Sequence, residues 1–308
     1  MIKINASDIK ITKHPDRSSL SAHHFHVECL NSLTGEKFRG FGSDFDEKFA
    51  LKKALAELFE RATILSSQSR AKSSNGFAAH SSPEKAIDKS QLELIERDSF
   101  FDHWFGKIPP KWLNFNDQQL ESQPMYRKFV KCIEASNTDL KIGILSQSAE
   151  CIVLIGAMLG RDEFGFAITT GAGTDLGETL NGILLTLARY YTIIENRKNA
   201  GEPLFQDVKE VQKPQDHFEY YLDPEKSQKC NWFFHDDGRE MKSLERLNIR
   251  SEFIDSRINF PIQLWTARST ADSAQDYFVG PTRTDKLNKK YFSELGTKIL
   301  NWELHPLP

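Results

Sequence analysis

The sequence predicts one large α+β domain in which helices pack on a mixed β-sheet. Three observations indicate this class. Apolar stretches of strand length recur along the chain, segments with helical apolar spacing separate them, and 39% of the 308 residues are hydrophobic, enough for a sizeable core. Because no linker divides the chain into two autonomous cores, we expect a single domain over residues 1–308.

The N-terminal part is predicted to be a hairpin followed by a helix. Residues 25–30 alternate between apolar and polar side chains, 31–36 supply turn residues, and 37–41 resume the strand pattern. From about residue 46 to residue 66 the pattern becomes helical. One apolar stripe runs along this helix, formed by Ala50, Leu51, Ala54, Leu55, Leu58 and Phe59.

A polar loop over residues 66–75 should precede a second helix. Ser82 is a suitable N-cap, Pro83 fits the first turn, and Glu84 complements the helix dipole. This helix is expected to end near Phe105, before Pro109 and Pro110 break the chain.

The remaining elements follow from the same patterns. We expect a helix near 118–136 and strands over 141–145, 151–158 and 165–169, the last of which leads through the glycine-containing residues 171–173 into a long helix over 176–196. The polar, proline-containing segment 199–230 is predicted to be a surface excursion. Residues 260–265 resemble a strand, and residues 301–308 form a proline-containing, extended C-terminal tail.

Composition excludes several classes of protein. Forty basic residues against 43 acidic ones give a net charge of −3, so nucleic acid is not an expected partner. No stretch has the length of a signal peptide or a membrane span, and we expect a soluble cytoplasmic protein that does not contact membranes. The four cysteines lack disulfide or zinc spacing and read as reduced thiols; they are Cys29, Cys132, Cys151 and Cys230.

One internal repeat stands out. A glycine segment, a helix start and an E-x-x-E-R motif occur twice, and each position of the second copy lies 36 residues after its counterpart. The motifs are Glu57–Arg61 and Glu93–Arg97. Since residues three and four apart share a helix face, each copy presents two glutamates and an arginine together.

The doubled motif predicts chemistry rather than a simple solvated surface. Both helices are rich in apolar residues, so their acidic faces are expected to turn toward a shared cleft. Four carboxylates in one cleft repel each other, and Mg²⁺ arriving with substrate phosphates would relieve that repulsion. The sequence therefore predicts a Mg-nucleotide site made of carboxylates, because no P-loop or kinase motif is present.

At these residues the sequence resembles the YcaO family. The resemblance rests on residues 40–43, Ala50, Leu55, the two E-x-x-E-R motifs, the segment 74–79, Ala86-Ile87 and Asp98. The type that it is most similar to is the cyclodehydratase of thiazole/oxazole-modified microcins. The resemblance implies ATP-dependent activation of backbone amides in a ribosomally made precursor peptide, which closes azoline (thiazoline or oxazoline) rings.

The resemblance also implies roles for individual residues. Glu57, Glu60, Glu93 and Glu96 would hold Mg²⁺ ions that bridge the phosphates of ATP, and Arg61 and Arg97 would support them. The nucleotide would be bordered by Ser74, Asn75 and Ser81. Arg189 stands where the family often has a glutamine, and we interpret it instead as a further phosphate contact. The tail would supply late catalytic contacts through His305 or the terminal carboxylate of Pro308.

This sequence departs from the family pattern at Lys85, Thr186, Arg189 and Leu304. Two alternatives to azoline formation therefore stay open. One is another ATP-dependent backbone modification, either thioamidation or the formation of a macrocyclic amidine. The other is a nucleotide-binding scaffold or regulator without turnover. As partners we expect the precursor peptide, a separate protein that binds its leader, and a second copy of the chain or a hetero-complex.

Overall fold

The computed structural model describes residues 2–4, 6–30, 35, 37–66, 74–114, 120, 122–235, 247–255, 258–293, 296–297 and 299–307. The chain forms two compact units, and each is assembled from three separate stretches. The first unit comprises Met1–Asp16, Ser21–Leu94 and Asn248–Asp272, and the second comprises Arg17–Leu20, Ile95–Leu247 and Ser273–Pro308. Neither unit is therefore a continuous segment of sequence.

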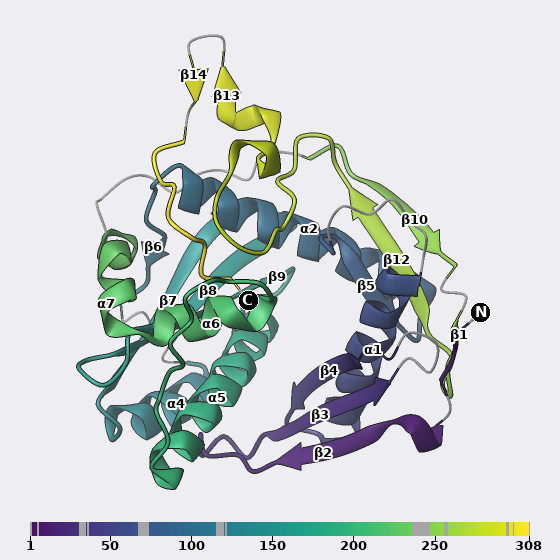
Figure 1. Ribbon diagram of the computed structural model, residues 1–308, viewed down its shortest axis with the longest axis horizontal. Helices are drawn as coiled ribbons and strands as arrows, with labels where there is room; N and C mark the ends of the chain where they lie inside the picture. Colours follow the sequence, from purple (N-terminus) through teal and green to yellow (C-terminus); the bar gives the residue numbers. More distant parts are fainter. Residues whose placement is uncertain are drawn as a thin grey trace. The chain divides into compact units, whose positions relative to one another are not determined.

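The first unit contains a three-stranded antiparallel sheet in the order β2-β3-β4, packed against helix α1 (Figure 1). The bounds are β2 Lys10–His14, β3 His23–Leu30, β4 Lys37–Asp44 and α1 Glu47–Ser66. The predicted hairpin and the first predicted helix are thus confirmed. Two short elements precede this sheet, β1 (Ile2–Lys3) and the 3₁₀ turn η1 (Ala6–Asp8).

Two glycines let α1 lie directly on β4. A Cβ atom at Gly42 would stand 2.0 Å from the Ala50 carbonyl oxygen, and one at Gly40 would stand 2.1 Å from the Ala54 carbonyl oxygen. Because real Cβ atoms do not approach so closely, only glycine permits this spacing. Gly40 and Gly42 therefore lie in the strand, and they serve close helix packing. The core at this contact consists of Phe25, Val27, Cys29, Phe38, Ala50, Ala54, Leu58 and Ala62.

A second sheet of the first unit has the order β10-β12-β5, all antiparallel. Its strands are β5 Phe77–His80, β10 Arg250–Ile254 and β12 Trp265–Thr270, and β11 (Ile258–Asn259) pairs with β1. Sequence reasoning missed β5, because its four residues, Phe-Ala-Ala-His, carry no period-2 pattern. Gly76, at φ +71°, turns the chain into this strand and lies against the Ser269 carbonyl oxygen.

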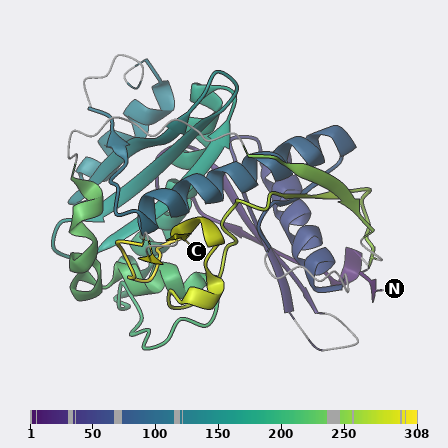
Figure 2. The same ribbon diagram turned by 90° about the horizontal axis from the view of Figure 1, so that it is seen from above.

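Helix α2 spans Pro83–Phe105, as predicted, and runs from the first unit into the second (Figure 2). Ser82 precedes it, and the Ser82 Oγ accepts a hydrogen bond from the Lys85 backbone N–H at 3.4 Å. The second half of the helix is aromatic. Its fully buried side chains are Phe100, Phe101, Trp104 and Phe105.

The second unit contains a four-stranded antiparallel sheet in the order β6-β7-β8-β9. Helices α4 and α5 pack against it. The bounds are β6 Lys111–Trp112, α4 Pro124–Glu134, β7 Thr138–Gln147, β8 Ile152–Gly160, β9 Phe166–Gly173 and α5 Leu176–Ala200. The three predicted strands are confirmed, and the third is longer than predicted, since residues 171–173 continue β9 and pair with β8.

Much of the segment 199–230 belongs to the core. Residues 201–210 carry no helix or strand and are mostly exposed, as a surface excursion would be. Further along, Phe218, Tyr221 and Leu222 are buried, and so is Cys230. The elements that bury them are α6 Pro214–Leu222, α7 Pro224–Ser227 and the 3₁₀ helix η2 Gln228–Phe234. Prolines stand at the first turns of α6 and α7, where they start helices instead of preventing them.

The end of the C-terminal tail, residues 305–307, is buried although it has no regular structure, whereas Trp302 before it is exposed. Backbone groups of the tail bond to aromatic side chains, as when Trp104 Nε1 donates to the Glu303 carbonyl at 3.1 Å and the Tyr221 hydroxyl donates to the Leu304 carbonyl. Leu307 is 1% exposed. The elements before the tail are η3 Thr284–Lys286, η4 Lys289–Tyr291, β13 Phe292–Ser293 and β14 Gly296–Thr297.

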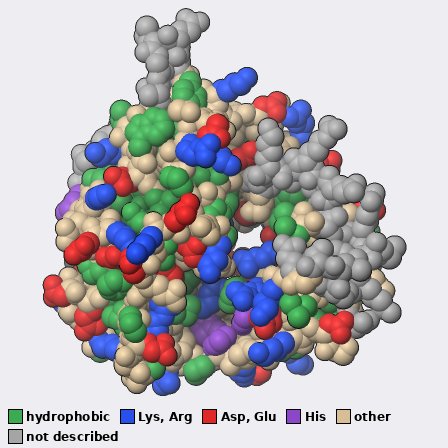
Figure 3. All heavy atoms as spheres, viewed as in Figure 1, with side chains coloured by type: hydrophobic (Ala, Val, Ile, Leu, Met, Phe, Trp, Pro, Cys, Tyr) green, Lys and Arg blue, Asp and Glu red, His purple; other side chains and the backbone are tan. Residues whose placement is uncertain are grey.

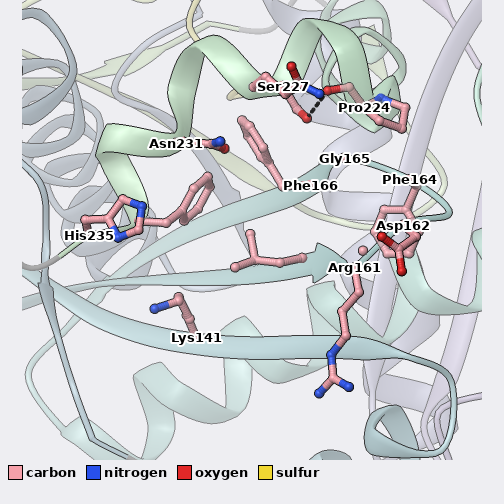
Figure 4. A pocket seen from close by; sticks show the side chains of 14 residues that line it. Lys141, Arg161, Asp162, Phe164, Gly165, Phe166, Pro224, Ser227, Asn231 and His235 are labelled. Carbon is pink, nitrogen blue, oxygen red and sulfur yellow. Dashed lines mark hydrogen bonds between the residues drawn. The ribbon is translucent and has the colours of Figure 1, made fainter.

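An ion cluster fixes this region to α2. Lys290 Nζ lies 2.6 Å from Asp98 and 2.8 Å from Asp102. Burial and the neighbouring Asp102 raise the pKa of Asp98, while Lys290 opposes that shift. On the face in Figure 3, basic and acidic side chains are interspersed, as the small net charge leads one to expect. Within the described residues, no helix combines the length and apolarity needed to cross a bilayer.

Candidate active site

Glu57 and Arg61 bond to the outer edge of β4, the last strand of its sheet. The Phe41 backbone N–H donates to Glu57 Oε2 at 2.6 Å, and Arg61 Nη1 donates to the Arg39 carbonyl at 3.1 Å. Arg61 Nη2 also lies 2.5 Å from Glu57 Oε1. The Glu57 carboxylate is therefore held by one backbone donor and one guanidinium, yet its side chain is 29% exposed and keeps lone pairs for a ligand.

Glu60 of α1 lies in an unfavourable electrostatic environment. Burial, followed by the negative charges of Glu93 and Glu57, raises the pKa of Glu60 well above the ordinary value of a glutamate. Arg61 and a hydrogen bond from the Ala79 backbone N–H act in the opposite direction. The structure thus brings together Glu57 and Glu60 from α1 with Glu93 from α2, so that their charges interact.

The second motif continues along α2 into the second unit. Glu96 lies one turn after Glu93, and it accepts a hydrogen bond from Thr170 Oγ1 at 2.6 Å. Arg97 lies over the ring of Tyr277, with its guanidinium carbon 5.1 Å from the ring centre. Each of these side chains is partly exposed.

The glutamates fit a magnesium ion that reaches them together with phosphate. Among the described residues, no group of three or more His, Cys, Asp or Glu side chains forms a ready-made metal cage. Mg²⁺ does not need one, because it is usually bound by one or two carboxylates plus substrate phosphates and waters. The mutual repulsion that raises the pKa of Glu60 is the kind of strain that a divalent cation relieves.

The other predicted binding residues occupy different places. Ser74 and Ser81 are exposed at the two ends of the stretch that contains β5, whereas Asn75 between them is 3% exposed. Arg189 belongs to α5, and its guanidinium carbon lies 5.5 Å from the ring centre of Tyr190. Their contacts with a nucleotide stay predictions.

His305 is embedded in the second unit. Its side chain is 0% exposed, its Nε2 bonds to the Phe278 carbonyl at 2.7 Å, and its ring stacks on His217 with centroids 4.3 Å apart. Burial, with His217 adding to the effect, lowers the pKa of His305 well below its ordinary value. This arrangement anchors the tail, and a role in catalysis would require the ring to leave it. Pro308 lies outside the described residues.

Sequence reasoning missed the groups that orient the glutamates. Two of them, the N–H groups of Phe41 and Ala79, belong to the backbone and leave no trace in residue identity. Thr170 lies near the end of β9, and its position could be expected only if that strand were known to lie beside α2.

Comparison with known proteins identifies the family to which the chain belongs. The family model described as YcaO cyclodehydratase, ATP- and Mg²⁺-binding, matches residues 65–257. The chain belongs to the YcaO family. The matched region includes the second E-x-x-E-R motif but begins after the first, so the role of Glu57 and Glu60 depends on the structure and the repeat. No curated protein matches the chain.

Solved structures of YcaO proteins share the fold at low identity. YcaO from Methanopyrus kandleri, bound with AMPPCP and Mg²⁺, is 14% identical with a TM-score of 0.58, and 90% of each chain is covered. A chain of the E. coli microcin synthetase McbBCD complex is 12% identical with a TM-score of 0.64, covering 97% of this chain and 96% of that one. A heterocyclase in complex with substrate and cofactor is 13% identical with a TM-score of 0.63, and this chain covers 50% of its length.

Proposed function

We propose that this YcaO protein is an ATP- and Mg²⁺-dependent enzyme that activates backbone amides of a ribosomally synthesised precursor peptide and closes azoline rings. The observation that carries the proposal is the convergence of Glu57, Glu60 and Glu93, from two helices of one unit, at a place where their charges repel. Membership of a family described as ATP- and Mg²⁺-binding and the YcaO neighbours in structure support it.

The proposed reaction uses ATP as a substrate. A cysteine, serine or threonine side chain of the peptide attacks the preceding carbonyl carbon, and its proton leaves to a base. The oxygen of the former amide then takes the terminal phosphoryl group of ATP, which releases ADP. Expulsion of phosphate from that carbon, with loss of the N–H proton of the former amide to a base, forms the C=N bond of the azoline. The peptide thus loses its amide oxygen as phosphate together with two protons.

The protein's share of this chemistry is positioning and neutralisation of charge. Mg²⁺, when bound, would neutralise the phosphate charge that develops during transfer. Glu57, held by the Phe41 N–H and Arg61, offers a carboxylate whose direction is fixed in advance. Glu60 and Glu93 would add hard oxygen ligands, and Glu96 is oriented by Thr170. Arg97 would face phosphate or orient the glutamates.

The peptide and the partner protein are part of the proposal. The E. coli microcin synthetase has been solved as a complex, also with pro-MccB17 bound. By analogy we expect a precursor peptide as substrate, a partner that binds its leader, and assembly of this chain with that partner or with a second copy. Thioamidation and amidine formation are alternative outcomes of the same amide activation, and a non-catalytic nucleotide-binding scaffold is the alternative of another class.

Calorimetric titration tests the site. Mg-ATP is titrated into the wild type and into the variants Glu57→Gln and Glu93→Gln, with Glu134→Gln, at an exposed glutamate of α4, as the matched control. We expect binding to be lost in the two site variants and unchanged in the control, because glutamine removes the charge while keeping the shape. Unchanged affinity in both site variants would remove the assignment.

Turnover tests the reaction. The chain is incubated with Mg-ATP, a candidate precursor peptide and a leader-binding partner, and the release of phosphate and the mass of the peptide are followed. Loss of one water mass per modified residue would support the azoline, and replacement of oxygen by sulfur would identify thioamidation. Nucleotide binding without phosphate release under every combination would point to the scaffold.

A further inference from the structure

The internal repeat extends one helical turn beyond the E-x-x-E-R motifs. Lys53 stands four residues before Glu57, and Lys89 stands four residues before Glu93, again at an offset of 36 residues. The repeated unit is therefore K-x-x-x-E-x-x-E-R. Since side chains four residues apart lie above one another on a helix, each helix carries a lysine on the same face as its glutamates, one turn toward the N-terminus.

The structure places Lys53 at the end of β4, beside the glutamate row of α1. Its Nζ lies 2.7 Å from Asp44 Oδ2 and 3.3 Å from the Ser43 carbonyl oxygen. The side chain of Lys53 is still 48% exposed. Asp44 and Ser43 end the strand on whose edge Glu57 and Arg61 are held, so one strand fixes both the basic and the acidic ends of this row.

Lys89 belongs to the corresponding row of α2, within reach of the same groups. The Lys89 residue as a whole is exposed, yet its ammonium group is crowded by protein atoms. That desolvation first, and then the positive charges of Lys53 and Lys85, lower its pKa, while Glu60 opposes the shift. Lys89 and Lys85 also help to lower the pKa of His80 at the end of β5, although burial is the larger cause. Lys53, Lys85 and Lys89 therefore repel each other in the unit where three glutamates repel each other.

A site with neighbouring acidic and basic side chains suits a ligand that carries both positive and negative charge. A divalent cation suits the carboxylates, and an anion suits the lysines one turn away. A metal-bound phosphate chain has this composition, because its metal is positive and its terminal oxygens are negative. If the lysines served only to neutralise the glutamates, each lysine should form an ion pair with a glutamate. Lys53 instead forms its ion pair with Asp44.

We propose that Lys53 and Lys89 form a phosphate-binding pair that holds oxygens of the nucleotide's phosphate chain while Glu57, Glu60 and Glu93 hold its metal. This inference rests on the proposed function and adds two phosphate-binding residues to it. Lys85, one turn before Lys89, extends the same basic row.

The experiment uses two ligands as probes. A lysine beside carboxylates should strengthen the binding of a phosphate-containing ligand and weaken the binding of a free metal cation. Mg-ATP and free Mn²⁺ are titrated separately into the wild type and into the double variant Lys53→Ala/Lys89→Ala. We expect affinity for Mg-ATP to fall at least about tenfold, since a charge-assisted contact to phosphate is lost. Affinity for free Mn²⁺ should rise, because two positive charges no longer oppose the cation.

Two further variants separate charge from folding. Lys52→Ala removes the same charge from the next residue of α1, about 100° around the helix, where Nζ lies 5.3 Å from the ring centre of Phe49. It should leave both affinities unchanged. The double variant Lys53→Arg/Lys89→Arg keeps the charges and should keep most of the affinity for Mg-ATP. Equal loss in the alanine and arginine variants would overturn the proposal.

The possible results separate a failure of the phosphate-binding pair from a failure of the proposed function. If both affinities rise in the alanine variant, the lysines are only counter-charges for the glutamates, and the phosphate-binding pair is refuted while the proposed function stands. The same holds if Mg-ATP binds unchanged to the alanine variant but no longer binds to Glu57→Gln. A wild-type protein that does not bind Mg-ATP refutes both.

Discussion

Two stacked histidines hold the buried tail, and acid should release them. His217 Nδ1 donates to the His305 carbonyl oxygen at 2.5 Å, and its Nε2 accepts from the Gly280 backbone N–H at 3.4 Å. His217 is therefore neutral, with its proton on Nδ1. A second proton would have to displace the Gly280 contact within a site that excludes water, since both histidines are 0% exposed.

The size of the effect follows from the pKa of His217. Burial lowers this pKa from 6.5 to about 4, while the bond to His305 opposes the shift. The folded chain thus binds fewer protons than the unfolded chain between these values, so the stabilisation is fully present above the unfolded pKa and is lost as pH falls toward the folded one. At about pH 5 the loss from His217 alone is about 2 kcal/mol relative to pH 8. His305, whose pKa is also lowered, adds to it in the same direction.

Urea unfolding at about pH 8 and about pH 5 measures this loss, followed by tryptophan fluorescence because Trp104 lies in the same unit. The variant His217→Gln keeps a donor and an acceptor but cannot titrate, so its stability should differ between the two pH values by about 2 kcal/mol less than that of the wild type. His235→Gln, at an exposed histidine, is the control and should retain the wild-type difference. An equal pH dependence in wild type and His217→Gln would refute the reasoning.

Three further predictions concern packing and charge. Gly42→Ala should destabilise the first unit by about 2 kcal/mol, because its Cβ would stand 2.0 Å from a helix carbonyl oxygen. Gly182→Ala is the control: a Cβ there meets open space, and the substitution should stabilise α5 by about 1 kcal/mol. Denaturant midpoints measure both, and a neutral Gly42→Ala would contradict the close packing. Lys290→Ala leaves two partly buried carboxylates without their shared cation and should cost about 2 kcal/mol, whereas exposed Lys289→Ala should cost little. Glu60→Gln should raise the melting temperature of the metal-free protein while Mg-ATP no longer raises it further, and a lowered melting temperature would show that Glu60 is not under repulsion.

Local signals predicted the parts of the fold that local energetics decide. The bounds of α1 and α2 followed from apolar spacing and from Ser82, Pro83 and Glu84 at a helix start. The repeat also led to the candidate site, because two equivalent helices with equivalent glutamates are hard to place except beside each other. That argument extended as far as Glu57, Glu60 and Glu93, which do interact.

Long-range contacts decided what the sequence could not show. β5 is a strand because β12 lies beside it, and the pairing of Ala78 with Ala267 cannot be read from four residues. Prolines and polar residues predicted a surface segment for the stretch that contains α6, and they predicted only an extended tail. The burial comes from single residues, such as His217 and His305, that meet aromatic side chains of other segments of the chain.

The 36-residue repeat includes the buried residues of the two helices as well as their charged residues. On α1 the buried row consists of Ala50, Ala54, Leu58 and Ala62, all 0% exposed, and the row one position earlier contains Lys53, Glu57 and Arg61. On α2 the buried row consists of Ala86, Ser90, Leu94 and Asp98, and the row one position earlier contains Lys89, Glu93 and Arg97. Burial of one row fixes the rotation of each helix about its axis, and the adjacent row is turned from it by about 100°. The same buried register on both helices therefore gives both charged rows the same orientation relative to their own packing surfaces. A substitution in the buried row that rotates either helix should disturb ligand binding as well as stability.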